Sequence, residues 1–479
     1  MNGDFARMTF DPARHFSRVL LQQGRMLLEA DYNEQSAIHH HFLRTLVVDL
    51  VGRCWRAGDG FTLAAGKQND FQISRGHLYI DGILCENDAD CTYATQPHGP
   101  VPAQPAATDG FMAYIECWER HVSPVQLADL REIALGGRDT ATRSQIAWQV
   151  RTASGEWAKD QAALLDAALG LQVQNTAAPA GKAAVQALKD KIAPALAGFL
   201  DALGKIGVAG EDAANCAKAV AFIDLLDLAQ PQMRAIARRS ADTLDACAIA
   251  ADSEYRGREN QLYRVEIHGP GAAGDATFKW SRENASIAFR VADEGMSADG
   301  NQWIVELEDL GHDRRTGLCE GTWVEIGSEA FEFGGVAASL AQVKRIEKGR
   351  RQLTLQVDPA DKTDFTAATW LRRWDQSAGL DASGTITVAE GAGNNGWITL
   401  ERGIQVQFSP GGLYRTGDYW LIPARVANGD ILWPRTAAGP TALPPGGLKR
   451  HRGPIGYGKK VGAAWTFTPC GCTQMPLCP

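Results

Sequence analysis

The clearest helical pattern lies near the N-terminus. Residues 32–51 contain neither Gly nor Pro, and Gly52 then suits the left-handed position that closes a helix. Asp31 followed by Glu34 resembles a capping box at the start. Apolar residues recur at helical spacing only in the second half: Ile38, Phe42, Leu43, Leu46, Val47, Leu50 and Val51. We predict a helix over 32–51 whose C-terminal half is buried against its own domain.

Alternation of apolar and polar residues takes over after residue 57. It is visible in Phe71–Ile73 and His77–Gly82, and further strands are predicted near 111–118 and 145–151. The pattern returns beyond residue 255, where three apolar positions oppose three polar ones in each of two runs: Tyr263, Val265 and Ile267 against Arg264, Glu266 and His268, and Ile404, Val406 and Phe408 against Gln405, Gln407 and Ser409. Strands with one solvated face indicate antiparallel sheets. Strand–helix alternation is missing, which excludes a doubly wound parallel sheet.

A segment rich in Ala, Leu and Lys interrupts the two β-rich stretches and predicts an inserted helical hairpin or small bundle. The C-terminal stretch is rich in Gly and Pro and predicts an extended arm. The expected fold class is α+β, with mostly antiparallel β-rich domains, a long N-terminal helix and the helical insertion. The predicted divisions are an N-terminal arm and helix at 1–56, a β-rich domain at 57–152, the helical insertion at 153–246, a second β-rich domain at 247–435 and a Cys-containing arm at 436–479.

Composition narrows the possible partners. The 479 residues are 45% hydrophobic and 22% charged, as in globular proteins, and 48 Lys and Arg against 56 Asp and Glu give a formal charge of −8. Because no basic block occurs, nucleic acid and anionic membranes are disfavoured. No apolar run reaches the roughly 18 residues that a membrane span needs, and no secretory signal follows Met1. We expect synthesis in the cytoplasm without a signal peptide and no membrane insertion.

Three consecutive histidines, His39–His41, fall inside the predicted helix. Neighbouring residues on a helix point about 100° apart, so the three imidazoles of one chain cannot share a metal ion. The first interpretation is a polar stretch that is solvated or lies between subunits. The alternative is that helices from several copies meet and that one His of each copy faces a symmetry axis.

Ten cysteines occur, and seven are scattered singly, as expected of small buried apolar residues. Cys470, Cys472 and Cys478 crowd the C-terminus. Three thiols are one ligand short of a structural zinc site, which His451 could complete. Three alternatives therefore stay open: free or buried thiols, a zinc site, or a disulfide formed after release from the cell.

Catalytic motifs are missing: the sequence has no nucleophile elbow, zinc-protease helix, P-loop or dinucleotide fingerprint. The Gly-rich stretch 269–274 follows a strand pattern and is better explained as a hairpin connection. Glu306 and Glu308 have a spacing compatible with glycosidase acids, and equally with a solvated sheet face. Thirteen Trp residues could supply sugar platforms, although cores and interfaces explain most of them. A carbohydrate-binding or carbohydrate-active surface protein is thus the alternative function.

Several segments resemble a large uncharacterised bacterial family, a domain of unknown function found near phage-tail-like and contractile injection gene clusters. They are Val19–Gln35, Cys117–Val122, Arg131–Arg143, Glu259–His268, Phe278–Asn284 and Tyr414–Arg425. The resemblance implies a structural protein of such a particle, associated with its baseplate, fibre or spike. It implies no catalytic residue.

Mixed charges in these segments suit ion pairs that are buried or lie at interfaces and fix orientation. We therefore predict a protein that is not an enzyme, forms a homo-oligomer, plausibly a trimer, and contacts other proteins of a particle that can leave the cell. Asp31, Glu34, His39 and Phe42 are the predicted interface residues, with Arg143, Arg264 and Trp280 as organisers of the structure around them. No cofactor is expected apart from the zinc alternative at Cys470, Cys472 and Cys478.

Overall fold

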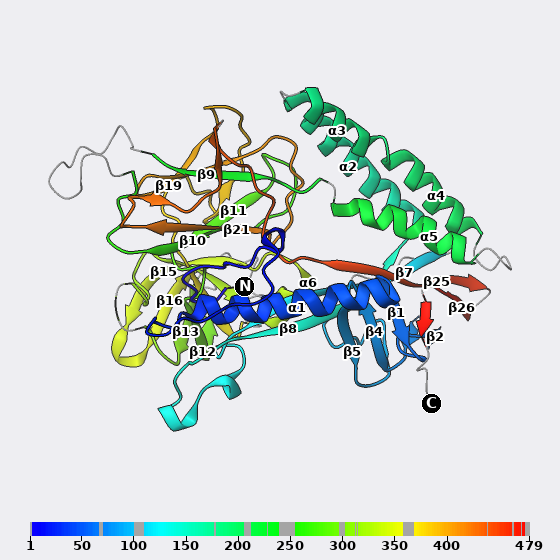
Figure 1. Ribbon diagram of the computed structural model, residues 1–479. Helices are drawn as coiled ribbons and strands as arrows, with labels where there is room; N and C mark the ends of the chain where they lie inside the picture. The colour runs from blue at the N-terminus through cyan, green and yellow to red at the C-terminus, as the bar shows by residue number, and fades with distance from the viewer. Residues whose placement is uncertain are drawn as a thin grey trace. The chain divides into compact units, whose positions relative to one another are not determined.

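The computed structural model (Figure 1) describes residues 2–66, 70–99, 110–176, 179–205, 212–227, 229–238, 254–296, 302–311, 313, 315–357, 368–437, 439–461, 464–470 and 472–474. The chain divides into two compact units, each built from discontinuous stretches. Unit 1 comprises Met1–Arg7, His121–Gln145 and Gln230–Gly447, and unit 2 comprises Met8–Arg120, Ile146–Ala229 and Leu448–Pro479. The consecutive ranges expected from composition therefore do not coincide with the units.

Unit 2 contains the N-terminal helix, most of the first β-rich region, the helical insertion and the C-terminal strands. Its helices are η1 (Pro12–Arg14), α1 (Glu29–Val51), α2 (Gly155–Asn175), α3 (Pro179–Lys189), α4 (Ile192–Gly204), α5 (Asp212–Ile223) and η4 (Asp224–Asp227). Its strands are β1 (Cys54–Ala57), β2 (Leu63–Ala65), β3 (Phe71–Ile73), β4 (Gly76–Ile80), β5 (Ile83–Asn87), β6 (Cys91–Thr92), β7 (Phe111–Val122), β8 (Arg143–Ala153), β25 (His451–Val461), β26 (Ala464–Pro469) and β27 (Cys472–Gln474). Two of the boundaries between the units fall inside β7 and β8.

Three sheets organise unit 2, in the strand orders β27-β1-β4-β5, β2-β3-β6 and β26-β25-β7-β8. The C-terminal region, expected to be an extended arm, forms β25 and β26, and β25 pairs antiparallel with β7. Aromatic residues fill the core between these strands, among them Phe71, Phe111 and Trp148. The helical insertion also differs from its expected range, because Met233–Ala237 near its end forms strand β9 in unit 1.

Unit 1 is almost entirely β-structure. Its helices are η2 (Ala128–Leu130), η3 (Ile133–Leu135), α6 (Glu329–Gly334) and η5 (Lys348–Arg350). Its strands are β9 (Met233–Ala237), β10 (Gln261–Ile267), β11 (Thr277–Ser281), β12 (Ala288–Met296), β13 (Gln302–Leu307), β14 (Trp323–Gly327), β15 (Leu340–Glu347), β16 (Gln352–Gln356), β17 (Trp370–Trp374), β18 (Ile386–Thr387), β19 (Ile398–Glu401), β20 (Ile404–Phe408), β21 (Tyr419–Arg425), β22 (Asp430–Ile431), β23 (Arg435–Thr436) and β24 (Gly439–Pro440).

Strands β12-β13-β16-β15-β14-β17 close into an antiparallel barrel, and β18-β11-β10-β21-β22 form a five-stranded sheet. Two smaller sheets have the orders β19-β20-β9 and β23-β24. The Gly-rich stretch 269–274 lies in the connection between β10 and β11, which pair antiparallel, so the predicted hairpin is confirmed. The mainly antiparallel β-structure expected from the alternation is present, whereas β10 buries both of its faces instead of one.

None of the helices in the described part of the chain combines the length and apolarity that crossing a bilayer requires.

Candidate functional site

A continuous stretch near the N-terminus exposes apolar side chains. Among the described residues, twelve of the twenty-one large apolar side chains that are exposed lie between residues 8 and 50. We call this set the N-terminal apolar surface: Met8, Phe16, Leu20, Leu21, Met26, Leu27, Leu28, Tyr32, Phe42, Leu43, Leu46 and Leu50. Each of these side chains is 41–85% exposed, which makes this segment a candidate interaction surface, because exposed apolar residues that gather together often mark such sites.

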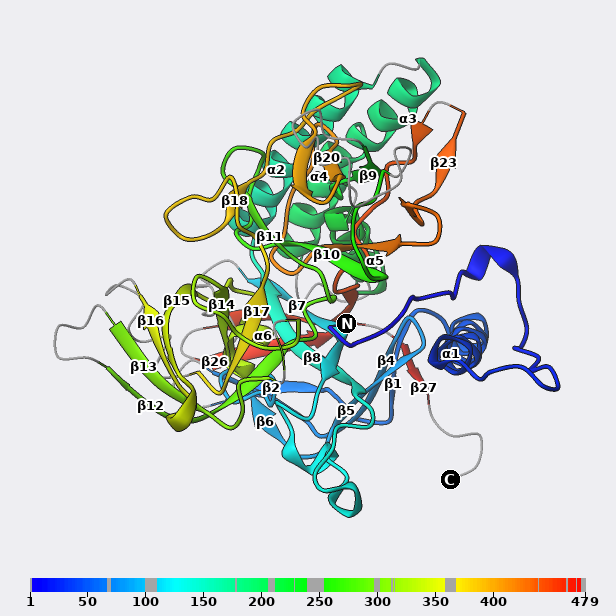
Figure 2. The same cartoon turned by 90° about the vertical axis from the view of Figure 1, so that its left-hand side faces the viewer.

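The first part of this surface is an extended arm, residues 8–28. Every residue of 11–28 except Val19 is exposed, and η1 is the arm's single helical turn. The arm runs out from α1 and back to it, as Figure 2 shows with α1 viewed nearly end-on. It touches the helix where Val19 N donates to Gln35 Oε1 at 2.7 Å and where the Thr9 hydroxyl donates to Glu34. The sequence analysis predicts an N-terminal arm but not its exposed apolar residues, because those between 20 and 28 follow neither a helical nor a strand period.

Helix α1 forms the second part of the surface. It begins at Glu29, three residues earlier than expected, and its N-cap Leu28 makes no side-chain cap hydrogen bond, so the predicted capping box is wrong. The early acids Glu29 and Asp31 instead complement the positive end of the helix dipole. The predicted burial of the C-terminal half is also wrong, since the buried residues of α1 are Ala30 and Ile38.

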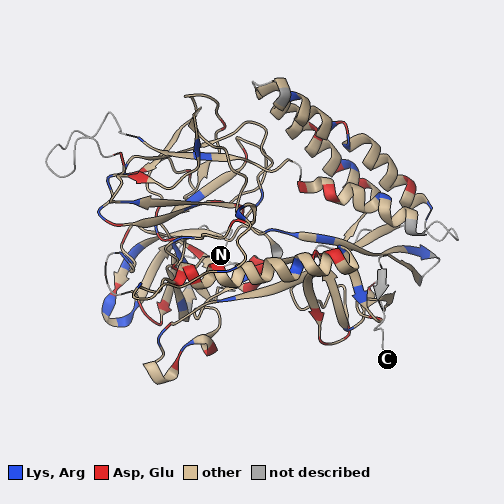
Figure 3. Ribbon diagram, viewed as in Figure 1, with Lys and Arg blue, Asp and Glu red and all other residues tan. Residues whose placement is uncertain are grey.

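The two faces of α1 have opposite roles. One face packs on unit 2, where Arg44 pairs with Glu119 at 2.7 Å and the backbone of Arg44 lies against Gly82 in the β4–β5 turn. A Cβ at Gly82 would lie 2.5 Å from the Arg44 carbonyl oxygen, so this approach requires glycine. The face across the helix carries Leu43, Leu46 and Leu50, exposed by 55–75%. Figure 3 shows α1 as mostly uncharged ribbon.

The structure gathers four predicted interface residues on α1. His39 and Phe42 are exposed, whereas Asp31 and Glu34 are half-buried, Glu34 by the arm. The three histidines separate as their spacing requires. The ring of His41 lies 5.8 Å from that of Phe10, and His39 Nε2 lies 2.8 Å from Gln35 Nε2 on the exposed side.

The other three predicted residues lie elsewhere, in unit 1 or at its boundary. Arg143 is exposed at the start of β8 and donates to the Thr142 carbonyl oxygen at 3.1 Å. Arg264 and Trp280 are buried, at 3% and 1% exposure, so neither lies on an exposed surface, and their role as organisers of the structure stays a prediction. Both side chains lie inside unit 1, where each stabilises a strand of the five-stranded sheet.

Arg264 belongs to a buried ionic network on β10 and β11. It pairs with Glu266, whose second oxygen lies 3.4 Å from Lys279 Nζ, and Lys279 also pairs with Glu325. Burial would raise the pKa of Glu266, but the charges of Arg264 and Lys279 outweigh that effect and hold its pKa well below the usual range. Trp374 Nε1 donates to Glu325 Oε2 at 2.9 Å. The expected solvated face of β10 is therefore buried, and ion pairs satisfy its charges.

A second buried network lies in unit 2 around Glu116 of β7. Its oxygens lie 2.8–2.9 Å from Arg151, Arg450 and Arg452. Burial would raise the pKa of Glu116, yet the charges of Arg450, Arg452 and Arg151 lower it to about 2. Arg452 also pairs with Asp227 at 2.8 Å, which fastens the end of the helical insertion to β25.

A disulfide between Cys216 of α5 and Cys470 makes a further link from the helical insertion to the C-terminal strands. The paired Cα atoms lie 5.7 Å apart, and next to them the Tyr457 hydroxyl donates to the Asn215 carbonyl oxygen at 2.7 Å. Cys470 is thus no thiolate ligand in this structure, which corrects its place in the zinc alternative. Cys478 lies outside the described residues, as does the Cys472 side chain. Within the described ranges, no three His, Cys, Asp or Glu side chains gather closely enough to hold a metal ion.

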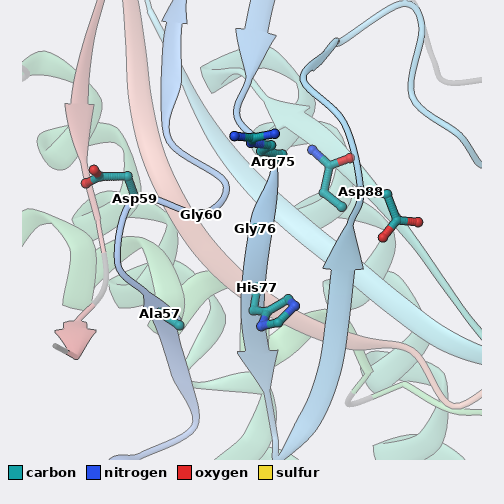
Figure 4. Close-up of a pocket in the computed structure, with 8 residues that line it drawn as sticks. Ala57, Asp59, Gly60, Arg75, Gly76, His77 and Asp88 are labelled. Atoms are coloured by element: carbon teal, nitrogen blue, oxygen red, sulfur yellow. The ribbon is translucent and has the colours of Figure 1, made fainter. Parts of the chain in front are cut away.

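A polar pocket of about 400 Å³ lies in unit 2 beside β4, where Ala57, Asp59, Gly60, Arg75, Gly76, His77, Asn87 and Asp88 line it (Figure 4). The carboxylates of Asp59 and Asp88 stand on opposite sides of β4 and do not converge. His77 Nε2 lies 3.8 Å from Glu86 across the β4–β5 ladder. The lining contains no hydroxyl or thiol group and no Trp, Tyr or Phe ring on which a sugar could stack.

All thirteen Trp residues are described, and none of them is exposed. Nine are buried and four are half-buried, including Trp55, which stacks on Tyr79 at 4.2 Å between ring centroids. The acids Glu306 and Glu308 each face an arginine, Arg351 at 3.5 Å and Arg131 at 2.8 Å. The Trp rings and the two acids on which the carbohydrate alternative depends are therefore at least half-buried or paired with arginine.

The fold and these surfaces describe a β-rich protein of two units with an apolar N-terminal extension. The model of a family of unknown function, DUF6519, matches residues 1–479, and the chain belongs to that family. Among solved structures, the chain is similar to one described as "Crystal structure of TssK", at 8% sequence identity and a TM-score of 0.17, with 82% of this chain and 98% of that chain covered. A likeness at this TM-score carries no argument about fold or function. A comparison with curated proteins finds no match.

Proposed function

We propose that this protein is a structural subunit of a phage-tail-like or contractile injection particle, and that it acts through protein–protein interfaces without catalysing a reaction. The N-terminal apolar surface carries the assembly part of the proposal. Twelve large apolar side chains exposed by 41–85% within residues 8–50 are more than isolated surface residues, and a stable interface takes roughly 800 Å² from each partner.

The kind of particle rests on the sequence resemblance to proteins encoded near phage-tail-like and contractile injection clusters. In this proposal the chain is made in the cytoplasm, assembles with copies of itself and with other particle proteins, and leaves the cell only within the particle. The buried ion pairs of both units support a structural role, because paired buried charges fix strand orientation more than they stabilise the fold.

The decisive experiment is the mass of the native protein, measured by light scattering from low to high micromolar concentration, together with sedimentation of particles from the producing cells. We expect an oligomer in the first measurement and the chain in the particle fraction in the second. A protein that stays monomeric at high micromolar concentration and never sediments with particles would contradict the proposal.

A further inference from the structure

The exposed face of α1 has the spacing of a coiled-coil seam. Positions 32, 36, 39, 43, 46 and 50 alternate steps of four and three residues, which is the heptad pattern of core positions. They are Tyr32, Ser36, His39, Leu43, Leu46 and Leu50, and every one of them is exposed in the chain. We call these six residues the seam.

The seam lies across the helix from the face that packs on unit 2. At about 100° per residue, seam positions centre roughly 180° away from the direction of Ala30, Glu34, Ile38 and Arg44. Ala30 and Ile38 are the two buried residues of α1, and Glu34 and Arg44 are among its half-buried ones. The helix is thus held by a mixed face, and its most apolar face is left for another partner.

We propose that the seam pairs with the same seam of further copies, so that the α1 helices form a parallel bundle about a symmetry axis. This inference rests on the proposed function and names the partner of the N-terminal apolar surface. A second copy is favoured over an unrelated protein because a heptad seam is self-complementary, with each core side chain filling a hole between four residues of the facing helix.

The distribution of side chains along the seam sets the direction. In a parallel bundle, each of Leu43, Leu46 and Leu50 meets its own equivalent, giving three apolar layers. In an antiparallel pair about the seam's midpoint, Leu46 would meet Ser36 and Leu43 would meet His39, which buries polar groups against leucine. Parallel packing also brings one His39 of each copy toward the axis, while His41 stays against Phe10 of its own chain.

The arm extends the contact. Alone, the seam covers only about 27 Å of helix, which is short for a coiled coil. Packing on unit 2 already holds α1 helical, so association need not supply the cost of forming the helix. Leu20, Leu21 and Met26, exposed by 68–85%, lie on the arm beside the same helix and can cover the flank of a neighbouring α1.

The first test compares two charge variants by light scattering at matched concentration. Leu43→Asp/Leu46→Asp places carboxylates in two apolar layers, and we expect association to weaken about a hundredfold or more, because each buried leucine contributes roughly 1.5–3 kcal/mol. The control, Thr45→Asp, lies between them on an exposed position about 140° from the seam. We expect the control to assemble like the wild type. Equal assembly of both variants, or equal loss, overturns the inference.

The second test fixes direction by oxidative cross-linking. In the parallel bundle, Leu46→Cys brings equivalent residues together at the axis, so oxidation should give a covalent dimer, while Thr45→Cys and the wild type should not. Cross-linking between Leu50→Cys and Tyr32→Cys variants, without a Leu46→Cys product, would mean antiparallel packing and overturn it.

The two proposals fail differently. A wild-type oligomer that survives Leu43→Asp/Leu46→Asp leaves the assembly function standing and overturns the seam. A monomeric wild-type protein absent from particles removes both.

Discussion

Helix α1 and strand β10 invert the usual placement of apolar and charged residues. α1 leaves Leu43, Leu46 and Leu50 exposed, while β10 buries Arg264 and Glu266. Both elements have clear sequence periods, and for both the environment predicted from the sequence is wrong. A period shows which residues share a face, whereas the partner packed against that face decides whether it is inside.

The two elements therefore contribute to different free energies, that of folding and that of association. The charges of β10 are already compensated within unit 1, so their removal should destabilise the fold. The leucines of α1 are not buried against other residues of the chain, so their replacement should weaken association and leave the fold intact. Each of the following measurements tests one side of this comparison.

The largest effect is expected at the buried network. Glu266→Gln leaves Arg264 and Lys279 without one of their carboxylates, and we expect the free energy of unfolding to fall by about 3–5 kcal/mol. Urea denaturation monitored by Trp fluorescence measures it. Glu306→Gln is the control, since the Glu306–Arg351 pair is 3.5 Å long with Arg351 exposed and Glu306 half-buried, and its loss should cost less than about 1 kcal/mol. Similar losses for both variants would show that burial does not make the loss of a carboxylate from the β10 network more costly.

A smaller loss is expected for the covalent link in unit 2. Cys216→Ser removes a bridge spanning 254 residues of sequence, and we expect about 2–4 kcal/mol less stability from the freed unfolded chain. Thermal unfolding with and without dithiothreitol measures the effect. Dithiothreitol should lower the Tm of the wild type to that of Cys216→Ser. The control, Cys319→Ser, replaces a free thiol and should respond to reductant like the wild type.

As pH falls, we expect the free energy of unfolding to decrease because of a buried histidine in unit 1 before the carboxylates are protonated. Burial lowers the pKa of His268 to about 3, from an ordinary value near 6.5. Between these values the unfolded chain binds a proton that the folded chain does not, so stability falls with decreasing pH by up to about 1.4 kcal/mol per pH unit. His268→Gln should reduce the slope between pH 6.5 and 4 in urea titrations, and His121, whose pKa burial also lowers to about 3, should account for part of what remains. The pKa of Glu116, held at about 2, adds its own loss only as pH falls from about 4.5 toward 2. An unchanged slope in the variant would assign the acid sensitivity to other groups.

The local sequence pattern predicted which helices and strands form, but it did not predict what surrounds them. Gly52 ends α1 as predicted, although at φ 97° and ψ 175° instead of in the left-handed conformation, and the alternation at 263–267 does mark β10. The pairing of Cys216 with Cys470 could not be foreseen, because only the fold brings α5 to the end of β26. Likewise, nothing local in Glu116 shows that three arginines surround it, two of them more than 300 positions away. Contacts between distant segments decide these features.

The smallest effect on stability is expected where the effect on assembly is largest. Leu43→Asp/Leu46→Asp changes two side chains that contact solvent in the isolated chain, so the free energy of unfolding of the dissociated protein should stay within about 0.5 kcal/mol of wild type. Urea denaturation at concentrations low enough to dissociate the wild type provides the comparison. Oligomeric wild type at high concentration should be more stable than the variant, because binding to the folded state stabilises it. If the dissociated variant lost several kcal/mol, α1 would pack on its own chain through the seam, and the contrast with β10 would disappear.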